Sequence, residues 1–301
     1  MSILVDSHNR VLIQGGTGEY GAAQVAWMRA AGTNVVGYVS PGRGGASIDG
    51  VPVFDVAADA ATSTGADSVV IYVPAAGVRD AVFEAAEAGL KLAVVAAELV
   101  PAHDALHALA RSRSKGMWVV GPNTVGITSP SKALLGSIPA EFTMPGPVGL
   151  ISRSGTMALM ISRALTRAGC GQTTVVSIGG DSVIGRAPRE YLERFIADDE
   201  TRLMVYVGEI GGTKEYELLD LIQSGGKPVI AIIIGRSAPA GKRMGHAGAL
   251  VGGERETAEA KREALREAGA IVVSNIGELV AQTARLAAEV HSPVHRSSIQ
   301  N

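Results

Sequence analysis

Short runs of β-branched and other apolar residues recur along the chain and alternate with alanine-rich stretches of helical periodicity. Within each run the apolar character is nearly continuous, which is typical of parallel strands that are covered on both faces. Helical stretches such as 78–88, 188–195 and 257–268 separate the runs. The pattern therefore predicts an α/β fold built on parallel sheets. The predicted strands are residues 11–14, 35–39, 68–73, 92–96, 118–120, 148–152, 174–178, 203–207, 229–234 and 270–273.

The predicted strands fall into two groups of five, on either side of a stretch rich in Gly, Pro and Ser. A chain of 301 residues is long enough for two domains of ordinary size. We therefore expect a first α/β domain over residues 1–126, a linker over 127–146 and a second α/β domain over 147–290. Residues 291–301 are polar and lack periodicity, which predicts a frayed tail.

Charge and composition exclude several classes of protein. The formal net charge of −2 argues against a general nucleic-acid binder, because such a protein needs a strongly basic face. The N-terminus lacks the pattern of a signal peptide, and apolar runs such as 229–234 are too short to span a bilayer. The single cysteine, Cys170, has no partner for an internal disulfide, which fits a reducing compartment. We expect a soluble, cytoplasmic protein that binds neither nucleic acid nor membrane.

A glycine-rich turn follows the first predicted strand, where residues 16–21 read G-x-G-x-x-G before an alanine-rich stretch. Glycines let the backbone approach a phosphate closely, and a helix N-terminus offers unpaired N–H groups. A tight strand–helix turn without a ligand has the same spacing. The position directly after the first strand nevertheless favours a phosphate-bearing cofactor.

The loop after the second predicted strand narrows the choice of cofactor. A site for NAD needs an acidic residue about 20 positions beyond the glycines, to bind the ribose hydroxyl. Residues 40–45 instead read Ser-Pro-Gly-Arg-Gly-Gly, and Arg43 suits an additional phosphate. NADP and coenzyme A both carry such a phosphate, so both fit and NAD is disfavoured.

Two loops in the second half follow predicted strands and carry groups suited to anion chemistry. Residues 152–156 read Ser-Arg-Ser-Gly-Thr and offer backbone donors at a helix start, although an ordinary Ser/Thr N-cap explains them equally well. Glu209 stands among glycines after the strand at 203–207, where it either orients a histidine or caps the next helix. Ligands of open α/β sheets bind at the carboxyl ends of strands, so both loops are candidates.

A third loop, residues 241–248, carries His246 between glycines, with Lys242 and Arg243 just upstream. The glycines leave the imidazole accessible, and the cations attract an anion. An imidazole, a carboxylate and an anion cradle form a coherent set for phosphoryl transfer, whereas a merely exposed loop histidine is the plain alternative. The other five histidines lie in polar or helical surroundings, and the sequence has no metal-ligand cluster of His, Cys and carboxylates.

Six motifs occur in the order seen in the alpha subunit of succinyl-CoA synthetase, and the chain resembles that family from residue 2 to about residue 290. The resemblance implies a Rossmann-type CoA-binding domain followed by a flavodoxin-like three-layer domain that bears a phosphohistidine. It also implies an NDP-forming acid–CoA ligase, in which the acid becomes an acyl phosphate and the CoA thiol then forms the thioester. The motifs are QGGTG at 14–18, PGRGG at 41–45, GPN at 121–123, SRSGT at 152–156, GEIGG at 208–212 and GKRMGHAGA at 241–249.

The same resemblance implies roles for individual residues. His246 takes up and returns the phosphoryl group, and Glu209 is its hydrogen-bonded orienter. The helix start at Ser154, Gly155 and Thr156 stabilises the phosphoryl group. The acid site includes Asn123, Val125 and Leu159. The CoA-contacting positions are Gly16, Thr17, Gly18, Glu19, Tyr20, Arg43, Ala96, Ala97 and Glu98.

None of the motifs indicates a nucleotide-binding site, since the sequence contains no G-x-x-x-x-G-K-S/T loop and no segment that resembles part of an ATP-grasp domain. The family carries that site on a separate beta subunit with an ATP-grasp domain, which binds ATP or GTP with Mg²⁺. The resemblance therefore implies a heterodimer or heterotetramer, in which this chain alone makes no thioester.

Several positions depart from the family pattern. Val125 stands where the family has proline, which restores a backbone N–H and adds a branched side chain near the acid. Leu159 replaces a usual tyrosine, Arg43 replaces a usual lysine, and Glu98 lacks its usual flanking threonine and glycine. The changes at Val125 and Leu159 favour a short dianionic acid such as sulfoacetate or malate, with neutral drift and retained succinate as the alternative.

Two functions of other classes also remain open at this point. One is a catalytically inactive, CoA-binding regulatory protein, and the other is an NADP-dependent oxidoreductase. The presence of both His246 and Glu209 argues against the inactive protein, and the full set of motifs disfavours both alternatives.

Overall fold

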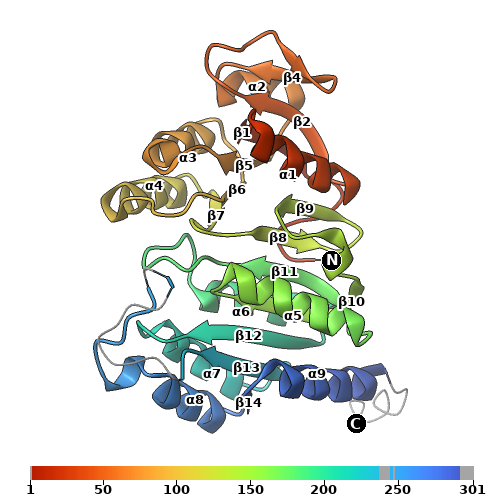
Figure 1. Cartoon of the computed structure of the whole chain (residues 1–301), viewed down its shortest axis with the longest axis vertical. Coiled ribbons are helices and arrows are strands. Elements are labelled where there is room, and N and C mark those ends of the chain that lie inside the picture. The colour runs from red at the N-terminus through yellow and green to blue at the C-terminus, as the bar shows by residue number, and fades with distance from the viewer. Residues whose placement is uncertain (1, 237–244, 247, 292–301) are drawn as a thin grey trace, which may run out of the picture.

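A computed structural model describes residues 2–236, 245–246 and 248–291, which form two units stacked along the long axis of the molecule (Figure 1). Each unit has a sheet that is mainly parallel, so the predicted α/β class is confirmed. All ten predicted strands are present within these sheets. Residues 237–244 and 247, which belong to the predicted loop around His246, and the predicted tail beyond residue 291 lie outside the described residues.

The sheet of the first unit has seven strands in the order β3-β4-β2-β1-β5-β6-β7, parallel except for the β3–β4 pair. The chain leaves β1 on one side toward β2 and returns on the other side to β5, so the strand order reverses at β1. A crevice forms at such a reversal, beyond the carboxyl ends of the strands. The strands are β1 (Arg10–Gly15), β2 (Asn34–Val39), β3 (Ser47–Ile48), β4 (Val51–Phe54), β5 (Ser68–Tyr72), β6 (Leu92–Val95) and β7 (Trp118–Val120), and the helices are α1 (Glu19–Ala30), α2 (Ala57–Thr64), α3 (Val78–Glu87) and α4 (Ala102–Ser114).

The second sheet has the order β14-β13-β12-β10-β11-β8-β9. Helix α5 packs with α9, whereas α6 and α8 pack with the 3₁₀ turn Lys214–Leu218, and β11 and β12 are buried throughout. Helices therefore lie in two groups around a covered sheet. The strands are β8 (Gly126–Ser129), β9 (Ala133–Gly136), β10 (Pro145–Ser152), β11 (Gln172–Ser177), β12 (Leu203–Glu209), β13 (Val229–Ile234) and β14 (Ile271–Val273), and the helices are α5 (Gly155–Arg167), α6 (Pro188–Ala197), α7 (Leu219–Gln223), α8 (Ala258–Glu267) and α9 (Ile276–His291).

The stretch 127–146, predicted as a linker, contains most of β8, all of β9 and the start of β10. Strand β8 pairs antiparallel with both β11 and β9. The pattern hides these strands because they are four residues long and because β8 carries buried hydroxyls that pair with backbone carbonyls, as when Ser129 Oγ donates to the carbonyl of Thr173 at 2.8 Å. We propose that the two units fold as domains and that this antiparallel pair belongs to the second.

One of the two hydrophobic clusters extends across both units. A single cluster of buried side chains contains Ile13 and Tyr38 of the first sheet together with Leu134 and Leu150 of the second. Polar contacts cross the same boundary, since the buried Thr33 hydroxyl donates to the carbonyl of Leu134 at 2.7 Å and accepts from its N–H at 2.9 Å. The units are therefore held against each other by packing and by hydrogen bonds.

Within the described part of the chain, no helix has both the length and the apolar character that a membrane crossing requires.

Candidate active site

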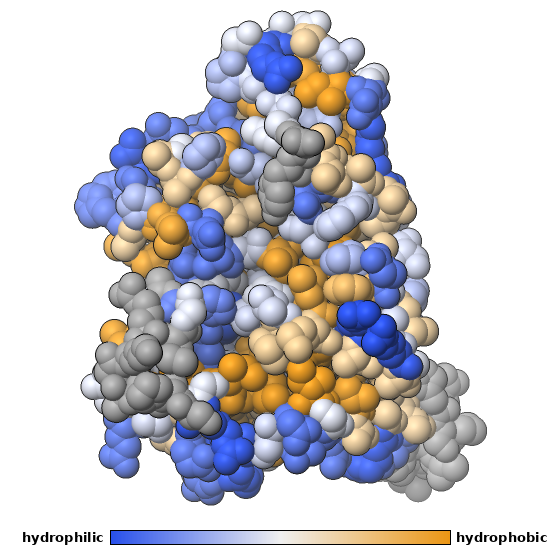
Figure 2. Space-filling model, viewed as in Figure 1, coloured by the Kyte–Doolittle hydropathy of each residue, from blue (hydrophilic) through white to orange (hydrophobic). Residues whose placement is uncertain are grey.

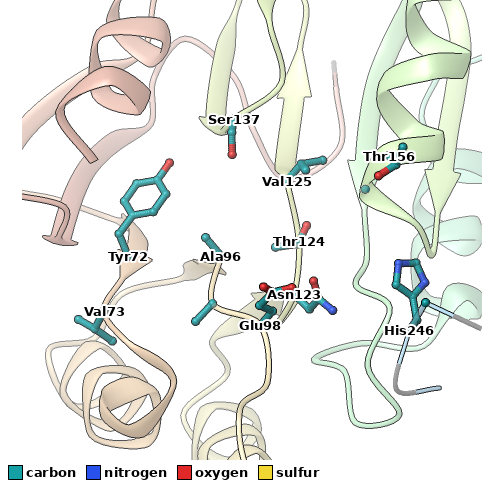
Figure 3. A pocket seen from close by; sticks show the side chains of 13 residues that line it. Tyr72, Val73, Ala96, Glu98, Asn123, Thr124, Val125, Ser137, Thr156 and His246 are labelled. Carbon is teal, nitrogen blue, oxygen red and sulfur yellow. The ribbon is translucent and has the colours of Figure 1, made fainter. Parts of the chain in front are cut away.

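A cavity of about 550 Å³ lies where the two units meet, at the carboxyl ends of β5, β6 and β7. In Figure 3, Tyr72 faces it from the first unit and His246 from the second, on opposite sides. Side chains with hydroxyl, amide, carboxyl and imidazole groups line much of the wall. The lining residues are Tyr72, Val73, Ala96, Ala97, Glu98, Asn123, Thr124, Val125, Ser137, Gly155, Thr156, Gly245 and His246.

The glycine turn before α1 adjoins this cavity. Gly16 has a positive φ of 67°, and a Cβ there would lie 3.2 Å from Cδ2 of Tyr72, a lining residue. A Cβ on Gly21 would clash with the backbone of Gly16, so the helix start and the turn pack directly together. The predicted fingerprint is therefore a tight turn whose backbone comes close to the cavity.

The predicted CoA-contacting residues divide into two groups. Ala96, Ala97 and Glu98 line the cavity, whereas Gly16, Thr17, Gly18 and Arg43 are not among its lining residues. Arg43 is exposed in the turn after β2, where its N–H donates to the carbonyl of Ser40 at 3.1 Å. Helix α1 begins at Glu19, but the side chains of Glu19 and Tyr20 lie outside what the structure describes.

Asn123 connects the two halves of the cavity. Its φ is +57°, its backbone N–H donates to the carbonyl of Ala97 at 2.8 Å, and its side-chain Nδ2 donates to Asp181 at 3.0 Å. Asparagine adopts this left-handed conformation more readily than most residues. The loop after β6 is thereby hydrogen-bonded, through Asn123, to the loop after β11.

Helix α5 begins at the cavity wall. Ser154 is its N-cap, and the Ser154 hydroxyl accepts from the N–H of Met157 at 3.3 Å, so this side chain acts as the N-cap considered above. Gly155 and Thr156 line the cavity, whereas the partly buried Leu159, one turn further on, is not among its lining residues. The first turn of a helix carries unpaired N–H groups and a positive dipole end, and both attract anions.

Val125 contacts the start of α5. A Cβ on Gly155 would lie 2.9 Å from Cγ1 of Val125, so the branched side chain lies directly against the first residue of the helix. The preceding Thr124 hydroxyl accepts from the N–H of Gly126 at 2.8 Å and bonds the carbonyl of Ser177. Val125 is thus held beside the first turn of α5.

His246 is held by a carboxylate. Its Nδ1 lies 2.8 Å from Oε2 of Glu209, which ends β12 and is buried. The ring packs against Gly180, where a Cβ would lie 2.6 Å from Cγ of His246. Among the described residues Nε2 has no hydrogen-bond partner, and the ring lines the cavity. The arrangement presents Nε2 as the nitrogen available for reaction.

The hydrogen bond to Glu209 raises the pKa of His246 above its ordinary value of 6.5, and this effect outweighs the lowering by burial. A carboxylate at Nδ1 fixes the tautomer that places the lone pair of the neutral ring on Nε2. It also compensates the positive charge that the ring acquires when Nε2 forms a bond. The pair therefore has the geometry of a nucleophile and its orienting base.

Several lining residues were not predicted from the sequence. Tyr72 is the last residue of β5 and Val73 follows it, and the strand-end position alone is a signal that could have indicated them. Ser137 follows β9 within the predicted linker, so no signal marked it. Within the described ranges, no group of three or more His, Cys, Asp and Glu side chains is placed to hold a metal ion.

Comparison with known proteins gives matches along most of the chain. Residues 6–99 match the model of the CoA binding domain, and residues 151–271 match that of the CoA-ligase family. The chain is 44% identical to succinate–CoA ligase [ADP-forming] subunit alpha 1 of Archaeoglobus fulgidus, over 95% of this chain and 98% of that protein. It is 41% identical to malate–CoA ligase subunit alpha of Methylorubrum extorquens, over 92% of this chain and 95% of that protein.

Among solved structures, ATP citrate lyase from Methanosaeta concilii in complex with (3S)-citryl-CoA superposes with a TM-score of 0.87 at 24% identity. The match covers 96% of this chain and 51% of the lyase chain, so this chain spans about half the length of that protein. At this level of identity the likeness shows a shared fold.

Proposed function

The chain belongs to the succinate–CoA ligase alpha-subunit family, and from that premise we propose that it forms CoA thioesters of a short acid through a phosphohistidine at His246. The family matches confirm the resemblance inferred from the six ordered motifs. The observation that carries the proposal is the 2.8 Å contact between His246 and Glu209 at a cavity that both units line.

The proposed chemistry uses Nε2 of His246 as the phosphoryl carrier. The Nε2 lone pair attacks the terminal phosphorus of a nucleoside triphosphate, and the nucleoside diphosphate leaves. A carboxylate oxygen of the acid then attacks the phosphohistidine, which gives an acyl phosphate and restores the ring. The CoA thiol attacks the acyl carbon, inorganic phosphate leaves, and the thiol proton passes to that phosphate or to water.

Two features of the chain support these steps. Glu209 holds Nδ1–H and compensates the charge of the phosphorylated ring. The first turn of α5, with Gly155 and Thr156 in the cavity wall, offers N–H groups to the phosphoryl oxygens. Ser154 supports this turn as its N-cap.

We propose that the CoA-binding site lies on the side of the cavity formed by the first unit. Support comes from the CoA-binding match over residues 6–99 and from the lining loop at Ala96, Ala97 and Glu98. Gly16 adjoins this side, and we assign Thr17 and Gly18 of the same turn to the CoA site as well. Arg43 offers a cation for the ribose phosphate. The roles of Glu19 and Tyr20 remain part of the same proposal.

We further propose an ATP-grasp beta subunit as the partner, which binds ATP or GTP and Mg²⁺. The relatives named above are alpha subunits, and this sequence has no G-x-x-x-x-G-K-S/T loop of its own. Figure 2 shows hydrophobic side chains gathered on the second unit in the region of α5, where Met160 is half exposed. An apolar patch of this kind suits a protein interface.

The acid is proposed to be a short dianion, with sulfoacetate and malate as candidates beside succinate. Val125 contacts Gly155 where the reacting group of the acid is expected, and its backbone N–H adds a donor that proline lacks. Assays of the reconstituted pair on all three acids should give a higher kcat/KM for sulfoacetate or malate. A preference for succinate would reject this choice of acid and leave the ligase mechanism intact.

The test of the carrier is phosphate labelling from [γ-³²P]ATP with the partner subunit present. We expect an acid-labile, base-stable label that is lost in His246→Asn and retained in His103→Asn, a matched change on the exposed surface of α4. A label that persists in His246→Asn would contradict the proposal. CoA binding without any label would instead indicate the inactive regulatory protein.

A further inference from the structure

Four charged side chains lie buried behind His246. They come from separate elements: Arg153 precedes α5, Glu209 ends β12, Glu215 lies in the turn after it, and Lys261 is in α8. None of their side chains is more than 7% exposed, and Lys261 is fully buried. Charged groups are almost never buried to this extent unless they are paired.

The four groups form a continuous chain of ion pairs. Glu209 Oε1 lies 3.2 Å from Arg153 Nη2, and Arg153 Nη1 lies 3.9 Å from Glu215 Oε1. Glu215 Oε2 lies 2.6 Å from Lys261 Nζ, and Glu215 Oε1 accepts from the hydroxyl of Tyr206 at 3.1 Å. Because the other oxygen of Glu209 contacts His246, the chain runs from the imidazole to α8.

Lys261 also holds the backbone beneath the histidine. Its ammonium donates to the carbonyls of Glu209 and Gly211, both at 2.8 Å. A Cβ on Gly211 would clash with the carbonyl of Gly248, two residues beyond His246. The ammonium therefore fixes the loop that carries Glu209 against the loop that carries His246.

The buried charges balance, since two cations face two carboxylates. Desolvation lowers the pKa of Lys261, whereas Glu215 is the first of the groups that oppose this lowering. Loss of one charge would leave a net charge in a region of low dielectric, close to the ring. Loss of one cation and one carboxylate together would keep the balance.

We propose that Lys261 and Glu215 are positioning residues for His246, which act through Arg153 and Glu209 to set the pH range in which the histidine is phosphorylated. The proposal rests on the proposed phosphoryl-carrier function. The charged and titratable groups that face the histidine or this chain, among the described residues, are Arg153, Asp181, Tyr206, Glu209, Lys214, Glu215 and Lys261.

The charge balance predicts opposite shifts for two single variants. Lys261→Met leaves an excess negative charge, which stabilises the imidazolium and favours protonation at the carboxylates. Phosphorylation needs the neutral ring and the ionised Glu209. The acidic limb of the pH profile for labelling should therefore move up by about one pH unit. Glu215→Gln leaves an excess positive charge, and its acidic limb should move down by about the same amount.

The double variant Lys261→Met/Glu215→Gln separates charge from geometry. It restores the balance, so the limb should return to the wild-type pH. It still lacks the two ammonium–carbonyl bonds, so the maximum rate of labelling should stay reduced. Glu259→Gln is the matched control, because Glu259 lies in the same helix as Lys261 and its side chain is 71% exposed. That control should leave both the pH limb and the rate unchanged.

The experiment measures labelling by ATP against pH for each full-length variant with its partner subunit. A parallel titration follows His246 by NMR in the full chain labelled at the histidine Cε1 carbons, assigned with His246→Asn. The midpoint of His246 should fall in Glu215→Gln. Limbs that move the same way in both single variants, or an unmoved midpoint in Glu215→Gln, would overturn the proposal.

The NMR readout separates this proposal from the function on which it rests. A midpoint that falls in Glu215→Gln, with no label on wild-type protein, would reject the phosphoryl carrier and support the charge coupling. Should Lys261→Met fail to fold, Glu215→Gln and the balanced double variant still test the sign of the shift and its reversal.

Discussion

At the level of single residues, the contact between His246 and Glu209 determines how the site responds to pH. The hydrogen bond raises the pKa of the imidazole, so the proton leaves Nε2 only above the ordinary histidine range. Since the protonated ring has no lone pair at Nε2, the rate of His246 phosphorylation should increase with pH through a midpoint above 6.5. Labelling measured between pH 5 and 9, a range of about two units on either side of 7, tests this.

Glu209→Gln should lower that midpoint and reduce the maximum rate on the order of 100-fold, because the amide neither stabilises the imidazolium nor fixes the tautomer. The comparison variant is Glu98→Gln, which changes a carboxylate of the same cavity that does not contact the histidine. A Glu209→Gln protein with the wild-type midpoint would contradict the assigned cause of the shift.

Gly180 is a second residue whose substitution should directly affect His246. A methyl group there would lie 2.6 Å from Cγ of His246, so Gly180→Ala should displace the ring from Glu209 and abolish most labelling. The backbone of Gly180 does not require a positive φ, so the free energy of unfolding should change by less than about 1 kcal/mol. Gly253→Ala is the control, since a Cβ there has no atom within 4 Å. Equal labelling of both variants would show that the ring tolerates the methyl group.

The sequence predicted the residues of the site that have unusual neighbours. His246 and Glu209 stand among glycines in loops that follow predicted strands, and that context indicates a chemical role from the sequence alone. No sequence signal distinguishes Lys261, because it lies in a highly charged helix of the kind that is usually exposed to solvent. Its ion-pair partner, Glu215, is also distant in sequence. Burial of an ion pair depends on tertiary packing, which no local pattern records.

Among elements, α5 most directly connects stability with chemistry. Ser154→Ala removes the bond to the N–H of Met157, which should cost about 1 kcal/mol of unfolding free energy and loosen the first turn. Labelling of His246 should fall because Gly155 and Thr156 lie in that turn. Chemical denaturation and labelling together test both effects.

Asn275→Ala is the matched control for the helix-cap variant. Asn275 Oδ1 accepts from the N–H of Glu278 at 2.9 Å at the start of α9, so a similar loss of stability is expected there. Because α9 contributes no residue to the cavity wall, labelling should be unchanged. Equal loss of labelling in the two variants would mean that general stability, and not the α5 turn, is responsible.

The strands that the sequence predicted are those with continuous apolar runs, and most of the missed ones lack such runs. Strands β3 and β4 form a short hairpin with polar or exposed positions, and β8 carries buried hydroxyl groups paired to backbone carbonyls. Strand β9 has only a short apolar run, from Ala133 to Leu135. The antiparallel pairing of β8 with β11, which attaches the β8–β9 hairpin to the second sheet, joins segments that are distant in sequence. Hydrophobic periodicity alone does not report such pairing.

For the whole molecule, the shared core predicts that both units unfold together. Calorimetry of the chain should show one transition. Thr33→Val removes both hydrogen bonds to Leu134 across the boundary and should cost about 1–3 kcal/mol, lowering Tm by several degrees. Thr64→Val, whose hydroxyl bonds only within its own helix, should cost less. Two resolved transitions would contradict a single cooperative unit.

The cavity between the two units also limits how such chains can be recombined. Loops from both units form its wall, from Tyr72 in the first unit to His246 in the second. Asn123 is hydrogen-bonded both to the loop after β6 and to the loop after β11. A chimera that joined the first half of one relative to the second half of another would assemble one wall from each parent. Such a hybrid would inherit neither parental pocket, so substrate choice in this architecture should be exchanged as a set of facing loops and not as a module.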